Sequence, residues 1–150
     1  MGSIVNTDST GAERQRLRRT IAEALNRLMA KKELDDEARD LAALIVLSLR
    51  QMDAGIQRSA AAWEKRSYFV KADHLRTDWE WAARSADRMA VLIRGGDWAR
   101  LPVVLASLAP RFADVQVVKL TRSPRTWQGA YARLMDLEGK PLRPADAAGP

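Results

Sequence analysis

Between residues 56 and 93 the chain contains neither glycine nor proline, and apolar residues recur there at helical spacing. The same period starts earlier, and its members are Leu41, Leu44, Leu49, Met52, Ile56, Ala60, Trp63, Val70, Leu75, Trp79, Ala82, Ala86, Met89 and Ile93. This spacing is typical of the buried face of an α-helix. It predicts either one very long helix over 36–94 or two long helices. Because a mean helix has about 11–12 residues, we favour a break between Ser67 and Asp73, with Asp73 as the new cap.

Weaker helical patterns flank this region. An amphipathic pattern over 12–31 carries Leu17, Ile21, Leu25 and Leu28 on one face. After the Gly95-Gly96 stop, Asp97 is expected to cap a helix that reaches residue 108. Ser123-Pro124 is expected to open a last helix that ends at Gly139. The segment 115–120 has both helical and strand character, but a lone strand would have no partner, so we expect a helix or irregular structure.

These patterns predict an all-α fold, a single-domain bundle of four to five helices with long central antiparallel helices. The bundle is expected over 12–139, with a flexible N-terminal lead over 1–11 and a flexible C-terminal tail over 140–150. The chain has no cysteine, which excludes disulfides and thiolate metal sites. Its longest apolar run, 41–47, is far shorter than the roughly 18 residues of a membrane helix. With no basic-then-apolar leader, we expect a cytoplasmic protein without membrane contact.

The segment from Trp63 to Trp81 is unusually rich in aromatic residues and also holds the only histidine. Residues two positions apart on a helix point about 200° apart, so Trp79 and Trp81 are expected on different faces. We therefore expect this segment to be central, and covered on more than one side by the chain or by a partner. Aromatic rings beside arginine are typical of interfaces. The predicted interaction surface consists of Trp63, Tyr68, Phe69, Arg76, Trp79, Glu80, Trp81 and Arg84.

His74 is the first residue to consider for catalysis or metal binding, because Asp73 adjoins it and Asp78 follows at i+4. An acid at that spacing can orient a histidine base. However, no nucleophile or second histidine completes a set, and the Glu-x-x-His pairs of helical di-metal sites are absent. We therefore expect no catalytic residue, metal or cofactor. An enzyme is the third-ranked alternative, with a polar site within 64–78 formed by Glu64, Lys71, Asp73, His74 and Asp78.

The formal net charge is +6, and arginines cluster near both ends of the chain. They are expected to be the phosphate contacts if the protein binds nucleic acid, and they are Arg14, Arg16, Arg18, Arg19, Arg122 and Arg125. A nucleic-acid-binding domain normally has a denser basic patch, so this function is the second choice. The favoured function is a non-enzymatic protein-interaction module, an adaptor, assembly factor or regulatory subunit. It is expected to self-associate, most simply as a dimer, through the Trp63–Trp81 region.

Overall fold

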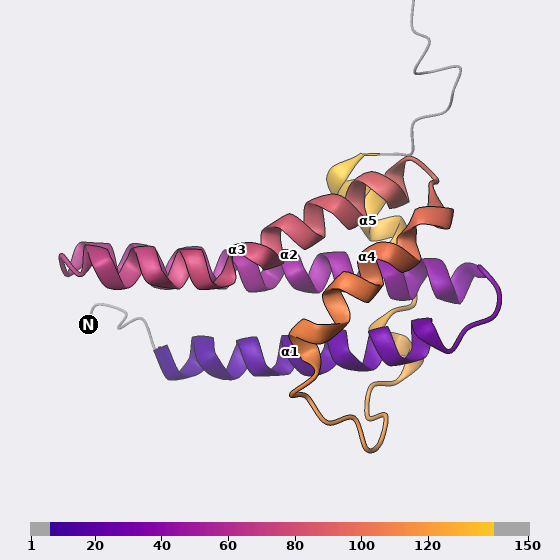
Figure 1. Ribbon diagram of the computed structural model, residues 1–150, viewed down its shortest axis with the longest axis horizontal. Helices are drawn as coiled ribbons and strands as arrows, with labels where there is room; N and C mark the ends of the chain where they lie inside the picture. Colours follow the sequence, from indigo (N-terminus) through magenta and orange to yellow (C-terminus); the bar gives the residue numbers. More distant parts are fainter. Residues whose placement is uncertain (1–6, 140–150) are drawn as a thin grey trace, which may run out of the picture.

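The computed structural model describes residues 7–139, which form a bundle of five α-helices without any strand (Figure 1). The helices are α1 (Thr7–Met29), α2 (Asp36–Lys65), α3 (Phe69–Arg94), α4 (Leu101–Leu108) and α5 (Ala130–Glu138), with 3-10 turns η1 (Trp98–Arg100), η2 (Ala109–Phe112) and η3 (Pro124–Thr126). The predicted all-α bundle is confirmed. α1 begins before the predicted residue 12, so part of the expected N-terminal lead is helical. Residues 1–6 and the expected tail, 140–150, lie outside the described residues.

α2 is the central helix of the bundle. It packs against α1, α3 and α5, and every residue from Leu41 to Val46 is buried. This part of the helix is therefore buried on all sides. Its start is set by Asp35, whose side chain accepts a hydrogen bond from the Ala38 N–H at 2.8 Å, and acidic side chains in the first turn add favourable charge at this end. The segment 63–81, which the sequence placed at the centre, instead includes the outer end of the α2–α3 hairpin (Figure 1).

The predicted break between the two long helices is confirmed, and it lies at residues 66–68. Ser67 adopts φ +64°, its N–H donates to the Glu64 carbonyl at 2.9 Å, and the Tyr68 N–H donates to the Trp63 carbonyl at 2.9 Å. These two bonds form a Schellman motif, and the accompanying apolar contact is the edge-on packing of Tyr68 against Trp63, with ring centroids 5.8 Å apart. The prediction that Asp73 caps α3 is wrong, because Asp73 lies inside α3 and Tyr68 occupies the N-cap position.

Position 67 provides a test of this motif. We expect Ser67→Gly to raise the free energy of unfolding by up to about 1 kcal/mol, because glycine adopts a positive φ without steric cost. Ser67→Val should lower it by about 1 kcal/mol or more, since β-branched residues are disfavoured there. Urea unfolding followed by circular dichroism measures both changes. An equal effect of the two substitutions would contradict the left-handed conformation of residue 67.

The second half of the chain departs from the predicted helices. Asp97 precedes η1 and accepts no capping hydrogen bond at its side chain; its carboxylate pairs with Arg100 at 3.3 Å. No α-helix or strand is assigned over 113–123, which confirms irregular structure at 115–120. The predicted last helix is shorter than expected, because Ser123-Pro124 opens only η3 and α5 starts after Gly129, at φ +79°. Asp40 on α2 then accepts hydrogen bonds from the Gly129 and Tyr131 N–H groups, at 3.2 and 3.0 Å.

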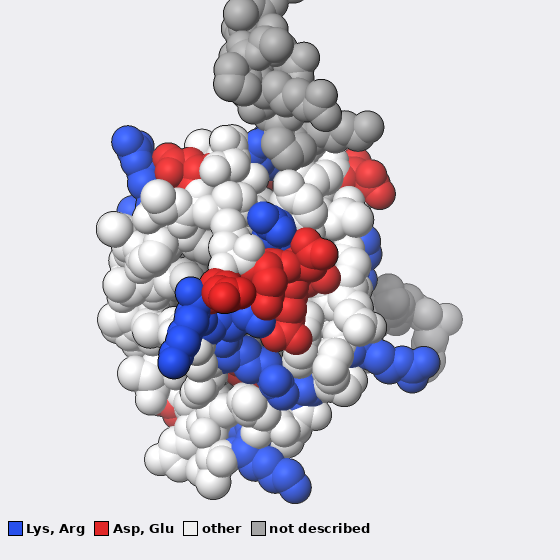
Figure 2. All heavy atoms as spheres, turned by 90° about the vertical axis from the view of Figure 1, so that its right-hand side faces the viewer, with Lys and Arg blue, Asp and Glu red and all other residues white. Residues whose placement is uncertain are grey.

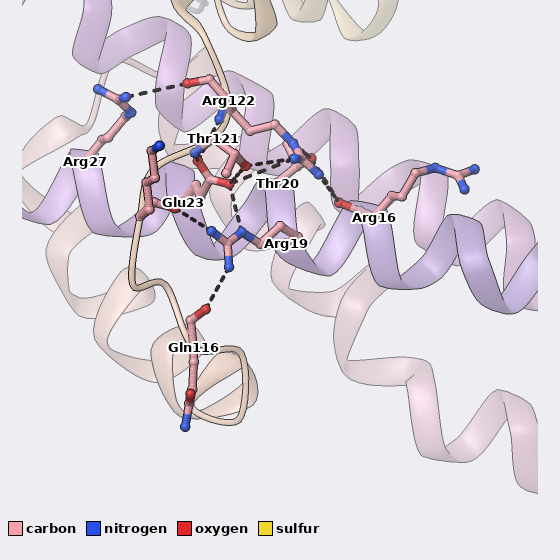
Figure 3. Close-up of polar contacts among 9 residues, drawn as sticks. Arg16, Arg19, Thr20, Glu23, Arg27, Gln116, Thr121 and Arg122 are labelled. Atoms are coloured by element: carbon pink, nitrogen blue, oxygen red, sulfur yellow. Dashed lines mark hydrogen bonds and ion pairs between the residues drawn. The ribbon is translucent and has the colours of Figure 1, made fainter.

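A buried glutamate fastens the irregular segment to α1 (Figure 3). Glu23 is 1% exposed and accepts hydrogen bonds from the Thr121 N–H at 2.6 Å, the Thr121 hydroxyl at 2.7 Å and the Arg122 N–H at 2.8 Å. Arg19 completes the set with a 2.8 Å ion pair. Burial alone would raise the pKa of Glu23, but these donors outweigh it and lower the pKa to about 2. Glu23 is therefore an anchor between two distant parts of the chain, and it is charged at neutral pH.

Candidate functional site

The outer end of the α2–α3 hairpin is the clearest candidate surface, and we call residues 63–74 the hairpin tip. The first turn of α1 lies beside Gly55, since the Cβ that an alanine would carry there is 3.8 Å from the Thr10 side chain. Beyond that point α2 and α3 pack mainly on each other, and small residues allow the close approach: Ser59, Ala60 and Ala72 are all buried. The hairpin consequently reaches past the start of α1 (Figure 1).

Three consecutive apolar residues are exposed at the hairpin tip. Tyr68, Phe69 and Val70 have exposed fractions of 54, 57 and 70%. They line a shallow hollow of about 560 Å³ together with Ser67, Lys71 and His74. Scattered apolar residues on a surface are ordinary, but a contiguous group is a common mark of an association site. Two of the predicted interaction residues, Tyr68 and Phe69, are thus accessible, while Val70 was missed because its spacing matched the helical core period.

The hairpin tip also carries several cationic side chains. The Lys71 ammonium lies 3.8 Å from the centroid of the Trp63 ring, and the Arg66 guanidinium lies 5.8 Å from it. The Glu64 carboxylate is instead bound by Arg76 at 2.8 Å, and this hydrogen bond holds the pKa of Glu64 below its usual value. The side chains of Lys65, Arg66 and Lys71 are exposed at the hairpin tip and outnumber its exposed acid, Asp73, so the tip has a cationic rim.

The other two predicted tryptophans pack within the molecule. Trp79 and Trp81 both lie against the core cluster. Their ring centroids are only 5.8 Å apart, so the expectation of separate faces is wrong for the rings themselves. Trp81 meets Phe112 of η2 edge-on at 5.6 Å. Of the remaining predicted residues, Glu80 and Arg84 form an exposed ion pair and continue the outer face of α3 beyond Arg76.

Most of the arginines proposed for phosphate contacts have internal partners. Arg18 binds Asp114 at 2.6 Å and keeps the pKa of that carboxyl group below its usual value. Arg19 donates to Glu23 and to the Gln116 and Lys119 carbonyls. Arg122 donates to Thr20 and to the Arg16 carbonyl (Figure 3). The side chains of Arg16 and Arg125 are exposed, and neither forms an ion pair within residues 7–139.

Other arginines pack over the rings of the tryptophans. All five lie within the described residues, and each has a cationic side chain over its ring. Arg14 covers Trp79 at 5.0 Å and Arg27 covers Trp127 at 4.7 Å. Such contacts normally occur about once per 70–80 residues, so they are concentrated here. The net charge of the chain therefore overstates the charge that is available to an anionic partner.

Charge at the other end of the molecule is balanced. Figure 2 shows acidic side chains gathered there among lysines and arginines. Around the α1–α2 connection, Lys31 pairs with Asp35 at 2.8 Å and with Glu37 at 2.9 Å, while Arg39 pairs with Asp36 at 3.1 Å. These hydrogen bonds from Lys31 help to lower the pKa of Asp35. This end is a mixed surface rather than a single-sign patch, and the unbalanced cationic surface lies at the hairpin tip.

The residues of the alternative polar site are not combined in a catalytic arrangement. Glu64 is bound to Arg76, and Lys71 lies over the Trp63 ring. His74 is exposed and lines the hollow of the hairpin tip. Asp73 and Asp78 are also exposed, and within residues 7–139 no group of three or more His, Cys, Asp or Glu residues is placed to hold a metal ion.

A second apolar surface was not predicted from the sequence. It is a groove between α3 and α4, and its exposed apolar residues are Val91 and Val103, each 67% exposed. The sequence pattern did contain a signal for this surface. Val91 falls outside the stripe of Met89 and Ile93 on α3, and Val103 is exposed beside the buried Leu101, Val104 and Leu105 on α4. Aliphatic residues off the core stripe on two neighbouring helices predict a shared apolar surface.

Comparisons with family models, with curated proteins and with solved structures find no match to this chain. Within the described residues, no helix is long and apolar enough to cross a membrane. The function is therefore argued from the two surfaces themselves.

Proposed function

We propose that this protein is a non-enzymatic interaction module, an adaptor, assembly factor or regulatory subunit, that contacts a protein partner through its hairpin tip. The observation that carries this proposal is the run Tyr68-Phe69-Val70, exposed at the end of a projecting hairpin. A soluble fold gains nothing from exposing three neighbouring apolar side chains, whereas burying each of them in a partner is favourable by roughly 1.5–3 kcal/mol at full burial.

The charge of the hairpin tip defines the partner further. Lys65, Arg66 and Lys71 are exposed at the same tip as the apolar residues, so an apolar pocket with an acidic rim is complementary. Three side chains bury too little area for a stable interface, which covers about 800 Å² on each partner. The contact is therefore expected to continue along the outer face of α3, over Arg76, Glu80 and Arg84.

Self-association through the same region remains a prediction, but fewer exposed rings now support it. Trp79 and Trp81 have intramolecular contacts, which leaves the exposed rings of Tyr68 and Phe69 as its support. Like charges around two facing hairpin tips would oppose a symmetric pairing, so an acidic partner of another kind is favoured over a second copy. Nucleic-acid binding is less favoured, because Arg18, Arg19 and Arg122 bind protein groups.

Site-specific photo-crosslinking tests the proposal directly. A photoreactive phenylalanine analogue is placed at Phe69, and the full chain is irradiated in its native cells. We expect a discrete protein adduct, because residue 69 would lie within the interface. An adduct at twice the chain mass would identify the partner as a second copy. The matched control carries the same analogue at Val118, which is 91% exposed in the irregular segment far from the hairpin tip.

The comparison between positions 69 and 118 decides how an adduct is interpreted. A discrete adduct at position 69 that is absent at position 118 supports the proposal. It should disappear when Lys65, Arg66 and Lys71 are replaced by glutamate, because the acidic rim of the partner would then be repelled. Equal labelling at both positions, or no adduct at position 69, would reject the hairpin tip as the contact surface.

A further inference from the structure

The α3–α4 groove is separate from the hairpin tip and is built almost wholly of apolar atoms. Val91 and Leu92 line it from α3, and Val103 and Val104 line it from α4. Its volume is about 610 Å³, within the range of about 300–1,000 Å³ that is usual for small-molecule sites. Only Val104 among its valines is buried, at 5% exposure. The two exposed valines belong to different helices, so one apolar chain lying in the groove would cover both.

Three charged side chains stand at the rim of the groove, and one of them, Arg88, has no ion-pair partner among residues 7–139. The lining includes Asp87, Arg88 and Arg100. Asp87 pairs with Arg50 on α2, which also holds Glu138 at 2.9 Å. Arg100 pairs with Asp97 at 3.3 Å, but its side chain is 79% exposed. Arg88 is exposed and forms no hydrogen bond or ion pair within residues 7–139. The Arg88 guanidinium, which has no partner within residues 7–139, therefore adjoins the apolar lining of the groove.

We propose that this groove binds a medium-chain amphiphilic carboxylate, with its alkyl chain against Val91 and Val103 and its carboxylate beside Arg88. An alkyl chain would cover the apolar lining of the groove, and an arginine can hold a carboxylate through two parallel N–H donors. A docked helix is a poorer fit. The lining has only two exposed apolar side chains, Val91 and Val103, whereas a helix in a groove is normally held by several anchors over two turns. The inference does not rest on the proposed function.

The test uses sodium decanoate as the probe and decyltrimethylammonium as a probe of equal chain length and opposite charge, both below the concentrations at which they form micelles. The full chain, with ¹³C-labelled valine and leucine methyl groups, is titrated by NMR. We expect decanoate to shift the Val91 and Val103 methyl signals saturably, and to bind at least about tenfold more tightly than the ammonium probe, since a charge-assisted hydrogen bond contributes about 1.5–3 kcal/mol.

Two variants locate the head group and the chain. Arg88→Gln should weaken decanoate about tenfold and leave the ammonium probe unchanged. Arg84→Gln is the matched control, because Arg84 is an exposed arginine one turn away that does not line the groove, and it should have no effect. Val103→Glu should abolish the binding of decanoate. Because Val103 is 67% exposed, this variant is expected to keep the wild-type thermal midpoint, which circular dichroism checks.

Several results would overturn the inference. Equal binding of the two probes would make the groove an apolar surface without acid selectivity. Saturable shifts at other methyl groups, with none at Val91 or Val103, would place the probe elsewhere. Groove shifts that depend on protein concentration without any probe would mean that a second copy covers the groove.

Discussion

Replacing Trp127 with alanine is expected to lower the free energy of unfolding by about 3–5 kcal/mol. The ring is 2% exposed and belongs to the main core cluster, with the Arg27 guanidinium 4.7 Å from its centroid. Its removal would leave a cavity between η3 and the body of the bundle and would uncover the arginine. Urea unfolding followed by far-ultraviolet circular dichroism measures the loss without relying on tryptophan emission.

Trp63→Ala is the matched comparison for this prediction. Trp63 is half-buried and lies outside the main core cluster, so its loss should cost only about 1–2 kcal/mol. Similar losses in the two variants would contradict the assignment of Trp127, rather than Trp63, to the core.

The second large effect is expected at Glu23. Glu23→Gln should lower the free energy of unfolding by about 3–5 kcal/mol at neutral pH, because removing one partner from a buried charged network leaves the others unpaired. The amide would place donors against the Arg19 side chain and the N–H groups of Thr121 and Arg122, all of which now donate to Glu23. Glu80→Gln is the control: its carboxylate pairs with Arg84 at the surface, so its loss should cost less than about 1 kcal/mol.

The pH dependence of stability provides an independent measure of the same anchor. Folding lowers the pKa of Glu23 from 4.5 to about 2. The unfolded chain therefore binds this proton more readily, and the contribution of Glu23, about 3 kcal/mol, is fully present above pH 4.5 and is lost as the pH falls toward 2. Urea midpoints measured between pH 6 and pH 2 should fall less in Glu23→Gln than in the wild type. Parallel curves would show that Glu23 does not titrate as an anchored carboxylate.

The helical periodicity of the sequence was sufficient to predict most of the fold. The buried face of α2 was predicted, because it depends on residues close together in the chain. The break between α2 and α3 was harder to place. At the end of α3 the left-handed stop residue is Gly96, at φ +69°, whereas at the end of α2 the same position is taken by Ser67, at φ +64°. Serine, unlike glycine, does not indicate a left-handed backbone conformation in a sequence.

The candidate surface was predicted only in part. The argument that the aromatic residues of 63–81 could not share one buried face was correct for Tyr68 and Phe69, which remain exposed. It was wrong for Trp79 and Trp81, because their partners, Arg14 and Phe112, lie far away in the sequence. A helical wheel describes one helix, and it cannot show which ring will be covered by a distant part of the chain.

The placement of cations also bears on how copies of this chain can assemble. A projecting apolar tip and an apolar groove on the same molecule are a hazard, since the tip of one copy could enter the groove of the next and build open-ended fibres. Here Lys65, Arg66 and Lys71 surround the tip, while Arg88 and Arg100 border the groove. Such head-to-tail stacking would bring like charges together at every junction. If the two surfaces bind acidic ligands as proposed, the same arginines and lysines would also oppose the polymerisation of the chain on itself.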